Sequence, residues 1–270
     1  MKVSSGLPLR AFPFDSGQVT AAVTTRHGGV SAGAYSTLNL GGHVGDDPAA
    51  VTENRRRLAA ALGVDKLTIA DQKHTARVAV VDEWLAGRGH GGVTDAAAAF
   101  PATDAMITNL PGTALTILVA DCAPVVLYDP VRRAVGAAHS GRLGTVKGVI
   151  PQTVKAMAAT FGSAPQDLLI GIGPAIGAAS YEIGAAESAE VTEAFGDAGT
   201  RLLTPTRPGH ATFDLAAAIR LQLRTAGVPE GNVHDMAIDT RTSTDAFFSD
   251  RAARPCGRFA ALAVLRTWPE

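Results

Sequence analysis

Three residues of types that bind metals lie beside predicted strand ends. Cys122, in an Asp-Cys-Ala-Pro run, follows one apolar run, and His139, 17 residues later, ends another. Upstream, residues 67–74 alternate as a half-buried strand does, which places Gln72 and His74 on one face. Two imidazoles and one thiolate suit zinc, and a catalytic zinc keeps three protein ligands and one open position. The long spacings leave open whether the three residues meet.

The alternative for these residues is structural, as a small buried cysteine and hydrogen-bonded core histidines. Cys256 is the only other cysteine. A disulfide between Cys122 and Cys256 would consume a proposed ligand, so a reducing compartment suits both.

The apolar patterns predict a mixed α/β fold, in which helices cover a system of short strands. The predicted strands are 19–25, 67–72, 77–81, 105–108, 114–120, 125–128, 134–139, 168–171, 201–204, 233–238 and 260–265. The predicted helices are 49–62, 145–161, 185–195 and 215–226. Pro48 and Gly63 mark the ends of the first helix, and Asp214 is a cap for the last.

Residues 87–101 show neither the helical nor the strand periodicity of apolar residues, and they contain four glycines, which predicts a loop. The loop lies between the His74 strand and Asp104 in the chain. A surface insertion is the first interpretation and a lid over the site the second. We do not expect His90, in this loop, to be a fourth ligand.

The composition excludes several classes of protein. The 270 residues are 46% hydrophobic, enough for a sizeable core. A net charge of -1, with the basic residues scattered, predicts no nucleic-acid partner. The sequence shows no signal peptide and no apolar run of membrane-spanning length, which predicts a cytoplasmic protein without a membrane partner. The oligomeric state stays open.

Short motifs run in a fixed order along nearly the whole chain. They are Thr-Thr-Arg-His-Gly-Gly-Val-Ser at 24–31, Asn-Leu-Gly at 39–41, Gln-Lys-His at 72–74, Thr-Asp-Ala at 103–105, Ala-Asp-Cys-Ala-Pro at 120–124, His-Ser-Gly-Arg at 139–142, Gly-Ile-Gly-Pro at 171–174 and Phe-Phe-Ser at 247–249. In this order the sequence resembles the YfiH-like laccase-domain family.

The resemblance implies a four-layer α/β/β/α arrangement with mixed sheets, as one domain over 1–270. It implies a zinc site made by His74, Cys122 and His139. It also implies a purine nucleoside phosphorylase with adenosine deaminase and methylthioadenosine phosphorylase activity, whose partners are a small nucleoside and phosphate. Other members are described as copper polyphenol oxidases or as a peptidoglycan editing factor that hydrolyses a misloaded muramyl precursor.

A phosphorylase needs groups that hold an oxyanion, and guanidinium groups do so without proton transfer. Arg26 is therefore the first candidate for phosphate. The substrate-binding candidates together are Arg26, Asn39, His43, Arg55, Gln72 and Arg142. The alternatives are surface arginines, a position on an amphipathic helix for Arg55, and turn chemistry for Asn39.

Asp121 completes the predicted catalytic set with the three ligands. It orients a water on zinc, or takes a proton, or only fixes a contact of a neighbouring ligand. Asp104 has the same interpretations.

The chain departs from the family pattern at several positions. Lys73 stands where an apolar residue is usual, and Asp250 stands where an aromatic residue or histidine follows Phe-Phe-Ser. Cysteines that many members have in segments 178–180 and 239–240 are absent. Any metal or redox role of those cysteines is therefore lost.

Three alternatives to a phosphorylase remain from the sequence. A cell-wall precursor hydrolase would need the same zinc and anion contacts. A multicopper oxidase is disfavoured, because one site cysteine and seven scattered histidines, without a His-x-His pair, cannot build its centres. A non-catalytic binding protein would bind no metal.

Overall fold

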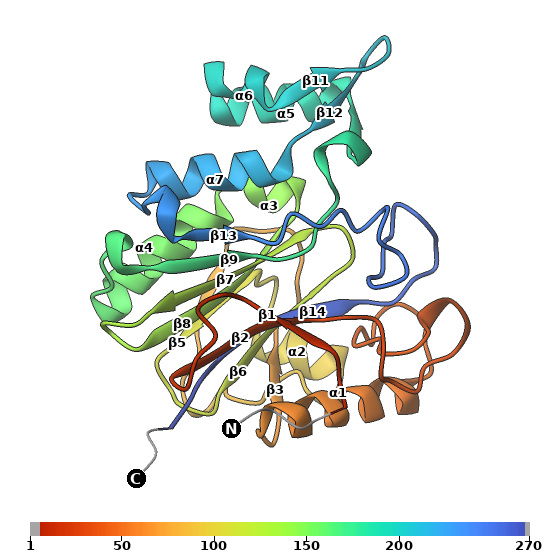
Figure 1. Cartoon of the computed structure of the whole chain (residues 1–270), viewed down its shortest axis with the longest axis vertical. Coiled ribbons are helices and arrows are strands. Elements are labelled where there is room, and N and C mark those ends of the chain that lie inside the picture. The colour runs from red at the N-terminus through yellow and green to blue at the C-terminus, as the bar shows by residue number, and fades with distance from the viewer. Residues whose placement is uncertain (1–5, 268–270) are drawn as a thin grey trace.

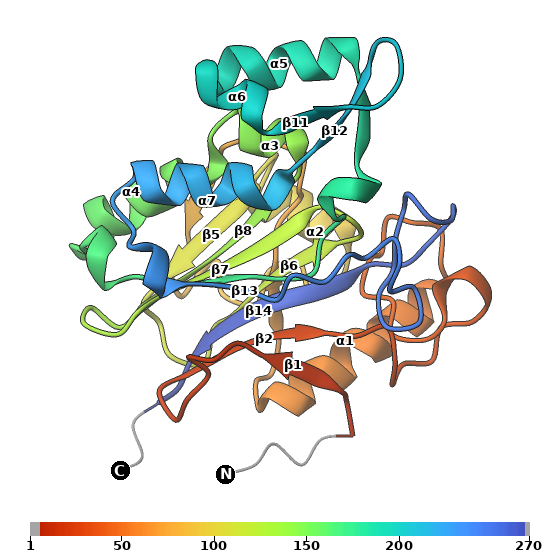
Figure 2. The same cartoon turned by 45° about the horizontal axis from the view of Figure 1, so that its top comes forward.

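Two large mixed sheets stack face to face in the computed structural model, which describes residues 6–267 (Figures 1 and 2). Sheet A has the order β1 (Leu9–Ala11), β2 (Val19–Thr24), β14 (Phe259–Leu265), β6 (Ala114–Val119), β3 (Leu67–Ile69). Sheet B has the order β13 (Val233–Asp235), β9 (Leu169–Ile172), β7 (Ala123–Asp129), β8 (Ala134–Ser140), β5 (Ala105–Thr108), β4 (Val78–Val80). A small antiparallel sheet contains β10 (Glu182–Gly184), β12 (His210–Phe213) and β11 (Leu203–Pro205).

Helices cover the outer faces of both sheets, so the predicted α/β/β/α layering is confirmed. Sheet A is covered by α1 (Pro48–Leu62), and sheet B by α4 (Val149–Phe161) and α7 (Leu215–Thr225) (Figure 1). Beyond α7 lies the small sheet with α5 (Ala185–Phe195) and α6 (Asp197–Arg201) (Figure 1). The remaining helices are α2 (Val93–Ala99) and α3 (Arg142–Val146), with short 3-10 turns at Gly33–Tyr35, Pro165–Asp167, Ala178–Ser180 and Glu230–Asn232.

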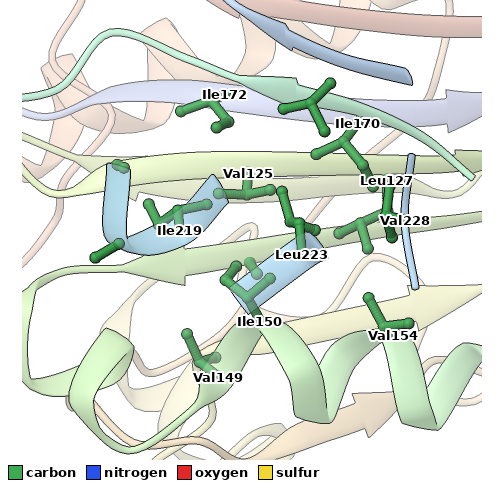
Figure 3. Packing of buried hydrophobic residues seen from close by; sticks show 14 of the residues in the cluster. Val125, Leu127, Val149, Ile150, Val154, Ile170, Ile172, Ile219, Leu223 and Val228 are labelled. Atoms are coloured by element: carbon green, nitrogen blue, oxygen red, sulfur yellow. The ribbon is translucent and has the colours of Figure 1, made fainter. Parts of the chain in front are cut away.

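Three apolar clusters fill the spaces between the layers. Leu58 of α1 packs with Leu262 on the outer face of sheet A. Phe259 packs with Val126 between the two sheets. Figure 3 shows the third cluster, where side chains of sheet B meet α4 and α7: Val125, Leu127, Ile150, Val154, Ile219 and Leu223. Successive residues of β7 thus enter different clusters, which explains its unbroken apolar sequence.

Most predicted elements are confirmed, because each is encoded by local pattern and caps. The strand 105–108 and the helix 185–195 have the predicted bounds. Asp47 caps α1 by accepting from the amide of Ala49, and Gly63 ends the helix in the left-handed conformation. The side chain of Asp214 accepts from the amide of Ala217 and caps α7.

The predicted strand 67–72 is wrong in its second half. It ends at Ile69, and His74 has a φ of 57°, so Gln72 and His74 do not share a strand face. Both sides of the Gln72 amide instead bond the backbone of Leu118 in β6, at 2.8 and 2.9 Å. The predicted strand 233–238 also ends early, at Asp235, before Ala237 with a φ of 51°.

Three further predictions need correction. The predicted helix 145–161 is two helices, α3 and α4, separated at Gly148, whose φ is 81°. The predicted strand 201–204 is wrong at its start, because Arg201 is the last residue of α6 and the observed strand β11 begins at Leu203. The predicted loop 87–101 contains α2, a helix of small residues that has little amphipathic pattern.

No helix within residues 6–267 combines the length and the apolar character that a bilayer crossing requires.

Asn54 of α1 fixes the long segment between β2 and α1. It is fully buried, and its Oδ1 accepts from the amide of Val30 at 2.8 Å. Its Nδ2 donates to the hydroxyl of Ser31 and to the carbonyls of Thr37 and Asn39. Asn54→Ala should lower the free energy of unfolding by about 2–4 kcal/mol, because buried partners lose their hydrogen bonds. Urea denaturation measures this loss.

Thr52→Ala, at an exposed position of the same helix, is the control. It should change the stability by about 0.5 kcal/mol or less. Equal losses in both variants would show that Asn54 does not fix the segment.

Candidate metal centre and cavity

Three segments bring His74, Cys122 and His139 together. Cys122 directly precedes β7, and His139 lies near the end of β8. Pro124, two residues after Cys122, stands opposite His139 in the pairing of these strands. The ligand atoms of the three side chains all lie within 4.8 Å of one another. The rings of His74 and His139 meet edge to face, with centroids 4.7 Å apart. The sequence-predicted ligands therefore form one cluster.

The donor set fits a metal ion. His74 Nε2 lies 3.7 Å from Cys122 Sγ. Two donors on a tetrahedral zinc, with bonds of about 2.0 and 2.3 Å, stand about 3.6 Å apart. Nitrogen and sulfur donors are those that zinc prefers, and three protein ligands leave one position open. These three residues could hold a metal ion, and their chemistry suits zinc.

Asp104 positions two of the three ligands. Its fully buried carboxylate accepts from the ring Nδ1 of His139 at 2.8 Å and from the backbone amide of His74 at 2.9 Å. The other oxygen accepts from the amides of Lys73 and Thr75 and from the Thr75 hydroxyl. Because Nδ1 of His139 is occupied, Nε2 is the nitrogen left for a metal. The geometry favours a positioning role for Asp104.

The charges of this cluster favour a thiolate. Burial raises the pKa of Cys122, but the rings of His139 and His74 outweigh burial and bring it to about 6. Burial lowers the pKa of His139, and the nearby Cys122 and Asp104 raise it to about 9. Burial also raises the pKa of Asp104, whereas hydrogen bonds from His139 and Thr75 bring it to about 2. A thiolate is the form of cysteine that binds metal.

Asp121 stands beside the cluster in a fixed conformation. Its φ is 83°, and its two carboxylate oxygens accept from the Thr240 hydroxyl and the Arg251 amide, both at 2.6 Å. Its carbonyl accepts from the amide of Ile176. These bonds favour the interpretation in which Asp121 holds the turn that carries Cys122.

A cavity of about 280 Å³ opens on the cluster. Six of the sequence-predicted site residues line it: His43, Arg55, Gln72, His74, Cys122 and His139. Gly89, Gly92 and Ala96 also line it, so part of the segment 87–101 forms its wall. His90 is not in the lining, and its Nδ1 accepts from the amide of Leu67.

The other predicted substrate residues are not among those that line the cavity. Arg26 donates to the carbonyls of Ser36 and Thr244, and its guanidinium lies 4.5 Å from the centre of the Phe248 ring. The Asn39 amide is fully buried among backbone groups and the carboxylate of Asp46. Arg142 begins α3 and pairs with Glu190.

Sequence reasoning missed two residues of the site. Arg258 precedes β14 and lines the cavity, although only its charge marked it in the sequence. Gly141 lies against the cluster, since a Cβ there would stand 2.5 Å from Cys122 Sγ. The position of Gly141 in the His-Ser-Gly-Arg motif was the available signal.

The comparisons with known proteins agree with this architecture. Residues 20–266 match the family model described as multi-copper polyphenol oxidoreductase laccase. The chain belongs to this family. A purine nucleoside phosphorylase of Streptomyces griseus is 42% identical over 247 residues, covering 91% of this chain and 94% of the relative. One of Mycobacterium tuberculosis is 38% identical over 256 residues, covering 92% of this chain and 94% of the relative.

Solved structures of this family have the same fold. The structure of YlmD from Geobacillus stearothermophilus has a TM-score of 0.89 and 33% identity, covering 95% of this chain and 94% of that one. The structure of the hypothetical protein YfiH from Bacillus licheniformis has a TM-score of 0.88 and 31% identity, covering 96% and 99%.

Asp104→Asn tests the positioning role. An amide keeps the shape but turns a donor toward the N–H groups that the carboxylate now accepts from, so His74 and His139 lose their fixed orientation. Zinc affinity should fall about 10- to 100-fold. Competition with a chromogenic chelator measures the affinity, and circular dichroism checks the fold.

Asp65→Asn, at an exposed position, is the matched control and should keep the zinc affinity. If a folded Asp104→Asn protein binds zinc as tightly as the wild type, the carboxylate does not position the ligands.

Proposed function

We propose that this protein is a zinc-dependent purine nucleoside phosphorylase that also deaminates adenosine and cleaves methylthioadenosine. The observation that carries the proposal is a single cavity with a metal-capable cluster and a group of cationic side chains in its lining. The relatives named purine nucleoside phosphorylase support it, because the similarity covers nearly the whole chain. A nucleoside and phosphate would meet in this cavity.

Two guanidinium groups in the lining suit phosphate. Arg55 is buried, and its Nε and Nη1 donate to the carbonyls of Leu40, Gly89 and His90. Burial lowers its pKa to about 10, which leaves it charged near neutral pH. Among the described residues no carboxylate pairs with Arg55, so an incoming oxyanion would be its counter-charge.

Arg258 is the second guanidinium. Its Nη1 donates to the carbonyls of Cys256 and Gly257, and its Nη2 lies 3.5 Å from the carboxylate of Asp250. This loose ion pair leaves Nη2 able to take a closer acceptor. Burial, then the charges of Arg258 and Arg55, lower the pKa of His43, so its ring is neutral at pH 7 and suits a ribose hydroxyl or the base.

The residues of the cavity would divide the work of phosphorolysis. Arg55 and Arg258 would hold phosphate as it attacks the anomeric carbon of the ribose, while the bond from that carbon to the purine nitrogen breaks. Zinc held by His74, Cys122 and His139 would supply Lewis acidity, and deamination would replace the amino group of adenosine by oxygen from water, with the C–N bond broken and ammonia released. The purine would leave with the electrons of the broken bond and take a proton.

The oxidase description of the family does not suit this site. Within residues 6–267, His74, Cys122 and His139 form the one group of three metal-capable side chains. A multicopper oxidase needs a blue-copper site and a further copper cluster, each with its own histidines. We therefore do not propose copper oxidation.

Metal content measured together with turnover of adenosine and inosine, with and without phosphate, tests the proposal. Bound zinc, inosine cleavage only with phosphate, and adenosine deamination without it are expected. The proposal fails if neither nucleoside is consumed by the zinc-loaded protein.

Cys122→Ser tests the metal assignment. Cys122 supplies the only thiolate of the cluster, so zinc content and both activities should fall while the cooperative unfolding transition remains. Inductively coupled plasma mass spectrometry gives the zinc content. Equal zinc in the variant and the wild type would remove Cys122 from the ligand set.

Arg258→Gln tests the phosphate assignment. Loss of a charged hydrogen bond should raise KM for phosphate about 10- to 100-fold, and water-dependent deamination should change much less. Arg26→Gln is the matched control, since Arg26 does not line the cavity. If Arg26→Gln raises this KM and Arg258→Gln does not, phosphate binds near Arg26 as the sequence first indicated.

A further inference from the structure

Asp250 places a carboxylate in the lining of the cavity, beside Arg258, one of the two guanidinium groups assigned to phosphate. Its Oδ2 accepts from Arg254 Nε at 2.7 Å, and its Oδ1 faces Arg258 Nη2 at 3.5 Å. Arg254 is the outer partner, with 77% of its side chain exposed, whereas Arg258 is 21% exposed. Asp250 thus stands between a solvent-facing cation and a cavity-facing one.

The charged groups of the lining nearly balance. Lys73 pairs with Asp71 at 3.1 Å, and Arg258 pairs with Asp250. Arg55 bonds only to carbonyls. With His43 neutral, three cations and two carboxylates leave one positive unit, and a zinc ion held by the Cys122 thiolate and two neutral imidazoles would add a second, which matches one phosphate dianion far better than two.

We propose that Asp250 is a specificity-determining residue that makes the cavity select uncharged nucleosides over nucleoside 5′-phosphates. The inference rests on the proposed function, because it concerns the nucleoside that occupies the same cavity. A nucleotide together with phosphate would bring about four negative charges to a zinc-loaded lining with two surplus positive charges. The carboxylate of Asp250 repels the additional phosphoryl group and partly neutralises the charge of Arg258.

The mechanism is electrostatic, so the size of the effect follows from one unit charge. In a partly hydrated cavity, a charge several Å from a phosphoryl group changes its affinity about tenfold. An uncharged nucleoside feels no such repulsion. The ratio of nucleotide to nucleoside affinity is therefore the quantity that Asp250 sets.

Asp250→Asn keeps the shape and removes the charge, and its one amide oxygen can still accept from Arg254 while Arg258 loses its acceptor. Calorimetry on the zinc-loaded protein, without phosphate, gives the affinities of inosine and of inosine 5′-monophosphate. The variant should bind the monophosphate about tenfold more tightly and inosine within twofold of the wild type. KM for phosphate in inosine cleavage should fall as well, since Arg258 is released from its carboxylate.

Two further variants locate the effect. Asp245→Asn makes the same charge change at an exposed position of the same segment and should leave the ratio unchanged. Arg254→Gln removes the closest counter-charge of Asp250 and should weaken monophosphate binding several-fold. An unchanged ratio in Asp250→Asn, or an equal gain in Asp245→Asn, overturns the inference.

The calorimetric readout separates this inference from the proposed function. If the wild-type protein turns over no nucleoside, the phosphorylase proposal fails, yet the change in the binding ratio still tests Asp250. If turnover is present and the ratio does not change, the phosphorylase proposal stands and the selectivity role of Asp250 is lost.

Discussion

The carboxylate of Asp104 is the interaction on which the candidate site depends. It joins the segment that leaves sheet A after β3 to the end of β8 in sheet B, through the His74 amide and the His139 ring. A buried carboxylate is costly unless all its oxygens are paired, and Asp104 accepts five hydrogen bonds. The fold therefore stabilises one arrangement of this segment, and that arrangement brings two ligands together.

The two stacked sheets explain why the metal-capable residues and the arginines of the cavity come from different layers of the fold. Cys122 directly precedes β7 and His139 lies in β8, and these neighbouring strands of sheet B fix both residues. The cationic wall comes from elements of the sheet A layer, with Arg55 on α1 and Arg258 before β14. A metal-capable cluster from sheet B and cations from the sheet A layer therefore face one cavity.

Local patterns allowed most of the fold to be predicted, and long-range contacts set the remainder. The apolar runs of sheet B and the caps of α1 are readable because neighbours in sequence determine them. The end of β3 at Ile69 was not readable, because hydrogen bonds to Asp104, about thirty residues away, turn the chain. Residue type also cannot distinguish Arg26 from Arg258. Strand pairing across the sheet, with β14 between β2 and β6, decides that Arg258 lines the cavity.

Residues at the positions that were expected to depart from the family pattern bond to neighbouring residues or line the cavity. Ser180 donates to the carboxylate of Asp239, so the two segments that lack the family's cysteines are joined by a hydrogen bond. The neighbouring Thr240 donates to Asp121, beside Cys122. Because a partly buried carboxylate needs donors, Asp239 depends on the hydroxyl of Ser180. Asp250 follows the same rule, since Arg254 supplies its donor. The residues at these positions are therefore held by hydrogen bonds beside the candidate metal cluster and its cavity.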